Sequence, residues 1–251
     1  MANGDIVFSW GLANRALPGI TQDNATVALR AGRRGELVTT PTSRPRWVFS
    51  DEGTYFIAHN PVNDASSSLL GHAQPVLVDV DSTMTKPFIH LRHDPAAVTR
   101  AYLDFIEIEV ITAGASGTAD SWAAQLDTGT TRVSSGGTAL TRLNPNMAST
   151  ATPALACLGG AVVTGAESAS VREIGHGQFR PTIQIAGDKY MFAFGGEPEQ
   201  VGATSIATIA HHVVCMPPVI LGPTDQLLLA LYSPSQSAAG VYKVRMGWVE
   251  R

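Results

Sequence analysis

Hydrophobic and polar residues alternate along many short segments of this chain. The clearest is segment 102–111, where apolar residues share one face of an extended strand and acidic residues share the other, namely Ile106, Ile108 and Val110 against Glu107 and Glu109. Successive side chains of a strand point to opposite sides, so this pattern predicts an antiparallel strand with one buried and one solvated face.

The same period of two recurs between segments rich in Gly, Ser, Thr, Asn and Pro. It predicts further strands at 76–80, 87–91, 122–126, 139–143, 182–186, 190–194, 212–216, 226–232 and 241–249. In the last of these, Tyr242, Val244, Met246 and Trp248 are expected to point inward, and Lys243 and Arg245 outward.

Two local signals add other elements. Segments 46–49 and 54–58 flank the four residues 50–53, which predicts a β-hairpin with a four-residue turn. Asp94 followed by Pro95 is typical of a helix N-terminus, so we expect one or two helical turns over 94–100.

Ten or more short strands with few helices predict an all-β fold, an antiparallel sandwich or barrel. No repeat of fixed period is present, which argues against a propeller or a solenoid. Residues 1–40 carry no strong pattern and are expected to form an extended N-terminal arm, and residues 41–251 a single β domain.

Composition removes several protein classes. The chain is 44% hydrophobic, which excludes disorder as its global state, and it contains no run of about 18 apolar residues that would predict a membrane-spanning helix. Only three lysines are present, Lys86, Lys189 and Lys243, which is not the composition of a coiled coil.

Charge is distributed unevenly. Residues 1–46 hold six arginines and three acidic residues, whereas the remainder holds 11 basic and 18 acidic residues. A basic arm on an acidic body could dock onto the acidic face of a neighbouring molecule, and Arg30, Arg33 and Arg34 are the candidate interface residues. The alternative is a solvated loop with scattered arginines. The net charge of −4 and the lack of a basic stripe argue against a nucleic-acid partner.

The N-terminus has no basic residue before Arg15 and no sustained apolar stretch, so we predict no signal peptide and folding in a cytoplasm. Cys157 and Cys215 cannot build the disulfide framework of a small secreted domain. We expect both to be buried free thiols.

Three clusters could carry chemistry. His211, His212 and Cys215 resemble a metal site, but on a strand only His211 and Cys215 share a face, and zinc needs three or four ligands. Asp79 and Asp81 lack the further oxygen ligands that calcium requires.

Glu107 and Glu109 are separated by roughly 6–7 Å along a strand, a spacing that could suit glycoside hydrolysis but that alternation alone also produces. The chain has no G-x-S-x-G, G-x-x-x-x-G-K-[ST] or G-x-G-x-x-G motif. We therefore predict a protein that is not an enzyme, with no catalytic, cofactor or metal site.

Several stretches resemble structural proteins of tailed-bacteriophage virions. They are Ser50–Phe56, Tyr102–Phe105, Ser135–Thr141 and the ending Met246–Arg251. The resemblance implies a jelly-roll-like sandwich, often trimeric, that decorates or cements a capsid or contributes to a tail or head fibre.

The leading hypothesis is accordingly a capsid decoration or cement subunit, made in the host cytoplasm and located in the virion. Its expected partners are copies of itself, as a homotrimer, and other virion proteins such as the major capsid protein, without nucleic acid or membrane. The first alternative is a tail or fibre module that binds a receptor or glycan, with Trp122 and Tyr232 as candidate contact aromatics. The second is a hydrolase of envelope polysaccharide that uses Glu107 and Glu109.

Overall fold

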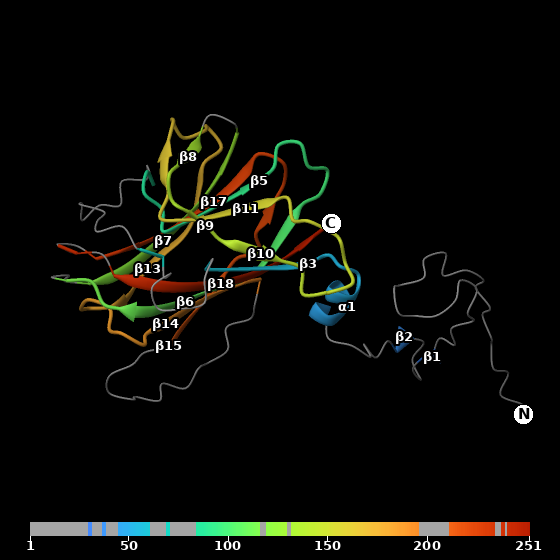
Figure 1. Ribbon diagram of the computed structural model, residues 1–251, viewed down its shortest axis with the longest axis horizontal. Coiled ribbons are helices and arrows are strands. Elements are labelled where there is room, and N and C mark those ends of the chain that lie inside the picture. The colour runs from blue at the N-terminus through green and yellow to red at the C-terminus, as the bar shows by residue number, and fades with distance from the viewer. Residues whose placement is uncertain are drawn as a thin grey trace, which may run out of the picture.

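The computed structural model describes residues 30–31, 37–38, 45–60, 69–70, 84–115, 119–129, 132–195, 211–233, 237–238 and 240–251. They form one short helix, α1 (Pro45–Asp51), and strands that assemble into a two-layered β-sandwich (Figure 1). The predicted all-β sandwich is confirmed. No helix within these ranges has the length and apolar character needed to cross a membrane.

One layer, sheet I, contains eight strands. Its main path runs in the order β10 (Thr141–Leu143), β3 (Tyr55–His59), β18 (Val241–Glu250), β6 (Ala101–Thr112), β14 (Lys189–Phe194) and β15 (His211–Met216). Two short strands extend it, β4 (Leu69–Leu70) beside β18 and β16 (Ile220–Leu221) beside β6.

The second layer, sheet II, contains six strands. They run in the order β13 (Arg172–Arg180), β7 (Asp120–Thr128), β17 (Asp225–Tyr232), β5 (Ile89–His93), β11 (Leu155–Gly159) and β9 (Thr138–Ala139). Two small antiparallel pairs belong to neither sheet by their hydrogen bonds. They are β8 (Val133–Ser135) with β12 (Val162–Thr164) and β1 (Arg30–Ala31) with β2 (Leu37–Val38).

Eight strands form the centre of the two layers, namely β3, β5, β6, β7, β13, β14, β17 and β18. In chain order these eight belong to sheets I, II, I, II, II, I, II and I. The result places β3, β18, β6 and β14 side by side in sheet I and β5, β17, β7 and β13 side by side in sheet II. This order of the eight strands is the one found in jelly-roll sandwiches.

One strand pair departs from the antiparallel expectation. β14 and β15 run parallel, with Lys189 opposite His211 and Phe194 opposite Met216. A parallel pair needs a long return connection, and the 16 residues between Phe194 and His211 supply it.

The core lies between the two sheets, and its centre is the pairing of β6 with β18. Val244 faces Ile108 and Met246 faces Ile106 in this ladder, and all four side chains are buried. Burying one such side chain contributes about 1.5–3 kcal/mol. The inward and outward faces predicted for both strands are therefore confirmed.

The outer side of sheet II is covered by the chain itself. Val163 of β12 packs with Met84 on outward-facing Ala123, Leu228 and Ala230 as a second small core. Beside it Arg132, itself buried, donates hydrogen bonds to Gln125 and Asp127 of β7 at 2.9 and 3.1 Å. Both faces of β7 and β17 are thus buried, which explains the unbroken apolar run Leu227–Leu231.

The hairpin predicted over 46–58 is wrong, because residues 45–51 form α1. Pro45 suits the first helical position, where its missing N–H has no partner to lose. Gly53, with a φ of 69°, adopts the left-handed conformation that ends helices, and the N–H of Thr54 bonds the carbonyl of Phe49. These two signals outweighed the strand-favouring residue types at 46–49.

Two other predicted elements are turns. Asp94 accepts hydrogen bonds from the N–H groups of Ala96 and Ala97, which closes a turn instead of a helix. The chain must then extend, because Arg100 pairs with the backbone of Arg251. Segment 182–186 forms no strand, because the N–H of Ile185 donates to the Asp188 carboxylate and the carbonyl of Ile185 accepts from the N–H of Asp188, which closes a turn. The strand predicted at 76–80 lies outside the described residues.

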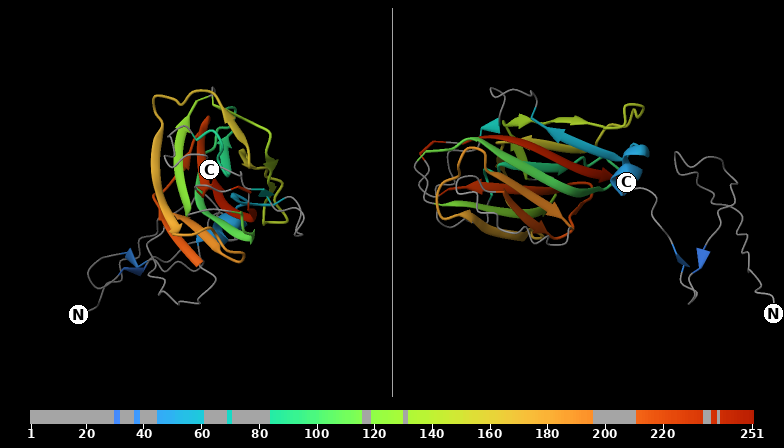
Figure 2. Two further views of the ribbon diagram at one scale, coloured as in Figure 1. Left: turned by 90° about the vertical axis from the view of Figure 1, so that its left-hand side faces the viewer. Right: turned by 90° about the horizontal axis from the view of Figure 1, so that it is seen from below.

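Most of the predicted N-terminal arm also lies outside the described residues. Within it, Arg30 pairs with Val38 and Ala31 with Leu37, forming the short β1–β2 ladder. Helix α1 follows the arm along the chain and lies with the C-terminus at one end of the sandwich (Figure 2). There the guanidinium of Arg251 stacks on the ring of Phe49 at 4.3 Å.

The two faces of β6 should respond differently to substitution. Ile106→Asp or Val244→Asp places an unpaired charge in the core and should destabilise the fold by about 4 kcal/mol or more. Glu109→Gln should change the free energy of unfolding by less than about 0.5 kcal/mol, because Glu109 is partly exposed and its ion pair with Lys189 is long, 3.7 Å. Urea unfolding followed by circular dichroism tests both, and an unfolded Glu109→Gln protein would contradict the assignment of faces.

Candidate functional site

Among the residues that the structure describes, sheet I differs from sheet II in how little covers its outer side. Apart from α1 at one end, no helix or strand of the described ranges packs over the outward side chains of β3, β18, β6, β14 and β15. We call this surface the open face. Its outward residues include His59, Ile57, Lys243, Arg245, Phe105, Glu107, Glu109, Lys189, Met191, His211, Val213 and Cys215.

One half of the open face carries charges of alternating sign. Arg245 of β18 donates a hydrogen bond to Glu107 of β6 at 2.6 Å, and Lys189 of β14 lies 3.7 Å from Glu109. The strand register also sets Lys243 opposite Glu109. Cross-strand pairs of this kind fix strand register and contribute roughly 0.2–1 kcal/mol each.

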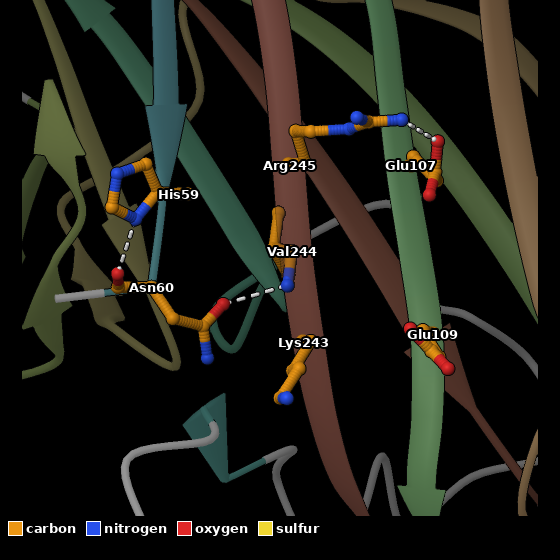
Figure 3. A pocket seen from close by; sticks show the side chains of 7 residues that line it. All are labelled: His59, Asn60, Glu107, Glu109, Lys243, Val244 and Arg245. Carbon is orange, nitrogen blue, oxygen red and sulfur yellow. Dashed lines mark hydrogen bonds and ion pairs between the residues drawn. The ribbon is translucent and has the colours of Figure 1, made fainter. Parts of the chain in front are cut away.

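A shallow groove of about 330 Å³ runs through this charged half (Figure 3). Asn60, at the end of β3, forms one wall and is held by β18, because its Oδ1 accepts from the N–H of Val244 at 2.6 Å and its Nδ2 donates to the carbonyl of Tyr242 at 3.2 Å. His59 stands beside it, with Nδ1 2.6 Å from the carbonyl of Asn60. Six of the seven residues that line the groove are polar or charged, and β3, β18 and β6 position them.

The other half of the open face is apolar and adjoins α1. A second groove, of about 470 Å³, is lined by Phe49, Tyr55, Tyr102, Leu103 and Val249 together with Arg46 and Asp104. The ring of Phe105 lies between the guanidinium groups of Arg46 and Arg245, at 5.6 and 5.7 Å. Such stacking keeps both cations over an apolar surface.

Asp104 connects α1 to sheet I. Arg46 pairs with both carboxylate oxygens, at 2.6 and 2.7 Å, and the Tyr55 hydroxyl donates to Oδ2 at 2.7 Å. Burial and then the Asp104 carboxylate raise the pKa of Tyr55, so the hydroxyl stays protonated and remains a donor. The hydrogen bond from Arg46 to Asp104 also raises the pKa of Arg46.

Next to this connection, Trp47 projects from α1 with 73% of its surface exposed. Tyr102, at the rim of the apolar groove, is 38% exposed. Aromatic side chains exposed together with a partly exposed arginine are typical of surfaces that contact another protein.

The candidate residues from the sequence fall in different places. Arg30 lies in β1, whereas Arg33 and Arg34 lie outside the described residues. Glu107 and Glu109 share the open face as expected, each with a cation within 4 Å. Asp79 and Asp81 are outside the described residues.

Of the two candidate glycan-contact aromatics, one is buried in the core. Trp122 is buried to 7% exposure, packed flat against β13, where a Cβ added to Gly175 or Gly177 would come within 2.9 Å of the indole. Tyr232 is partly buried. Trp122 therefore serves the core, and its assignment as a contact residue is wrong.

The histidine and cysteine segment behaves as its strand pattern predicts, with one exception. His211 and Cys215 point outward from β15, and His212 points inward onto Phe179 and Tyr190. Cys157 is buried and Cys215 is exposed, and both are free thiols, so the expectation that both are buried is wrong for Cys215. Within the described ranges, no three His, Cys, Asp or Glu side chains gather as they would around a metal ion.

Sequence reasoning missed the residues that partner the two glutamates and the cluster around Asp104. Lys243 and Arg245 were assigned outward, but their opposition to Glu109 and Glu107 follows from the pairing of β6 with β18. The Arg46–Asp104 contact spans 58 residues. One indication of this contact was present in the sequence. Pro45 and Gly53 are residues typical of the two ends of a helix, and they place Arg46 on a helix and not on a strand.

Comparison of the chain with protein-family models, with curated proteins and with solved structures finds no match.

Removing the Asp104 carboxylate should loosen α1. Asp104→Ala leaves the buried Tyr55 hydroxyl without its acceptor and Arg46 without its partner, which should lower the free energy of unfolding by about 1–2 kcal/mol. Amide hydrogen exchange over residues 45–51 should accelerate. Glu107→Ala is the matched control and should change stability by less than about 0.5 kcal/mol, since Arg245 is exposed; equal effects in both proteins would contradict the connecting role of Asp104.

Proposed function

We propose that this chain is a structural subunit of a tailed-phage virion, a decoration or cement protein that stabilises the capsid through contacts with copies of itself and with the shell. The jelly roll supports this proposal, because it is a common architecture of viral capsid domains, although lectins and cupins share it. The stretches that resemble virion proteins support it independently.

The observation that carries the proposal is the difference between the outer sides of the two sheets. In the described residues, β7 and β17 of sheet II are covered by Met84, Val163 of β12 and a buried ion pair, whereas the open face presents an apolar groove, Phe105 and paired charges. A partly apolar sheet surface of this kind is typical of a subunit that binds a partner there.

The charge distribution gives the partner a chemical description. The basic residues of 1–46 end at Arg46, directly beside the open face, and the rest of the chain is acidic. In an assembly, the arm of one subunit would meet the acidic body of the next, which favours association between like subunits. A homotrimer closes such heterologous contacts.

The competing functions have less support. A glycan-binding module usually presents exposed aromatics on its loops, but the most exposed aromatic side chain in the described ranges is Trp47, on α1 at the base of the arm. For hydrolysis, Glu107 and Glu109 lie on a broad, shallow sheet surface, and each is paired with a cation.

The first test is the solution mass of the full chain. We expect light scattering to give three times the chain mass of 26.4 kDa. Substituting Arg30, Arg33 and Arg34 together by alanine should shift the equilibrium toward monomers at least tenfold without unfolding the sandwich. The matched variant with lysine at all three positions keeps the positive charges but loses the planar guanidinium groups. Its monomer fraction should lie between those of the wild-type protein and the triple alanine variant.

The second test is binding to the shell. Purified phage heads that lack the subunit should sediment with the added wild-type chain in a fixed stoichiometry, and should then resist heat or dilution better. A stable monomer that does not bind heads would contradict the proposal, and saturable binding in a glycan array would favour the receptor-binding alternative.

A further inference from the structure

A buried cluster of polar side chains joins the two sheets where β7 and β14 begin. Asp120, the first residue of β7 in sheet II, is 3% exposed, and Asp188, just before β14 in sheet I, is fully buried. Tyr190 lies between them. Its hydroxyl donates a hydrogen bond to Oδ2 of Asp120 and lies 3.4 Å from Oδ2 of Asp188. Two buried carboxyl groups thus share one hydroxyl.

The two carboxyl groups differ in their other contacts. Asp188 accepts from the guanidinium of Arg180 at 2.8 Å and from the N–H of Ile185 at 2.8 Å, so its negative charge is compensated. Among the described residues, the side-chain donor that reaches Asp120 is the Tyr190 hydroxyl. The hydrogen-bond partner of Asp120 is therefore neutral and is shared with an anion, while the charge of Arg180, the residue opposite Asp120 in the β13–β7 ladder, acts on both carboxyl groups.

Counting protons shows what the cluster requires. A hydroxyl donates one hydrogen bond, so Tyr190 can serve only one of two ionised carboxylates at a time. If Asp120 carries a proton, its own O–H can donate to the Tyr190 oxygen, and the Tyr190 proton can turn to Asp188. One additional proton satisfies every group in the chain from Asp120 to Arg180, and it removes the repulsion between two buried anions.

We propose that this cluster is a proton-dependent latch between the two sheets, closed when Asp120 is protonated and weakened when it ionises. Burial, with the charge of Asp188 adding to it, raises the pKa of Asp120 from 3.8 to about 7, although the hydrogen bond from Tyr190 and the charge of Arg180 act in the opposite direction. The proton is therefore held up to neutral pH.

The surrounding titratable groups do not account for the same behaviour. Burial raises the pKa of both Tyr190 and Tyr242, so both hydroxyls stay neutral, and Gln184 donates to that of Tyr242 at 2.5 Å. His212 of β15 packs on the Tyr190 ring, and burial followed by the charge of Arg180 lowers its pKa. Because the pKa of His212 is lowered in the folded state, its protonation destabilises the fold as the pH falls. This pH dependence is opposite to that of Asp120.

The sign of the effect follows from linkage. The folded state holds the Asp120 proton more tightly than the open state, so the contribution of the latch is complete below pH 3.8, is lost as the pH rises to about 7 and is constant above that. Within this window, local opening should become about tenfold more frequent per pH unit.

Backbone hydrogen bonds at this end supply the readout. The N–H of Gly187 bonds the carbonyl of Val110 at 2.7 Å, and the N–H of Val110 bonds the carbonyl of Asp188 at 2.8 Å. Both connect β6 to the turn that carries Asp188. The amide of Leu155, bonded to Glu250 at 3.0 Å, is a reference outside the cluster.

The experiment is amide hydrogen exchange on the full chain from pH 5 to 8, expressed as protection factors corrected for intrinsic rates. Protection at Val110 and Gly187, relative to Leu155, should fall about tenfold per unit up to pH 7 and then level off. Asp120→Asn should abolish this slope, because its amide can donate to Tyr190 as the protonated carboxyl does. His212→Gln should retain it.

A wild-type slope in Asp120→Asn, or its loss in His212→Gln, would overturn the proposal. Should Asp120→Asn fail to fold, the ¹³C shift of the wild-type Asp120 carboxyl provides a second measurement. We expect it to titrate with a midpoint near pH 7, and a midpoint below pH 5 would equally overturn the latch.

Discussion

The structure depends on the burial of one face of β6 and β18 at the centre of sheet I. Their ten-residue ladder sets Ile106, Ile108 and Val244 against sheet II, and the same pleat turns Glu107 and Arg245 to the opposite side. Because the side-chain period of a strand is two, the register that builds the core also builds the open face. Core and surface are therefore two consequences of one pairing.

The outer sides of the two sheets differ, so the molecule has two unlike faces. Val163 of β12 and Met84 cover the outer side of β7 and β17 in sheet II with a second small core, beside the buried Arg132–Asp127 pair. Sheet I instead has α1 at one end, fixed by Asp104, and strand faces over which no other helix or strand of the described ranges packs. The proposed function assigns assembly to this side of the molecule.

The sequence predicted the strands whose two faces meet different surroundings. Alternation located β6 and β18 because one side of each is solvated, and a strand was also predicted at 226–232, where β17 lies. The prediction failed at α1, where Trp47, Val48 and Phe49 are residue types typical of strands, and it missed β13, whose glycines accommodate Trp122. The partners of Glu107 and Asp104 come from distant segments, and only the topology decides such neighbours.

The central claim is that the open face, with α1, is the surface through which this protein assembles. Hydroxyl-radical footprinting of the full chain, assembled and dispersed, tests it most directly by mass spectrometry. The account predicts that Trp47 and Tyr102 lose most of their reactivity on assembly, whereas His176, whose side chain is 74% exposed on the far edge strand of sheet II, keeps its own. Protection of His176 with unchanged Trp47 and Tyr102 would contradict it.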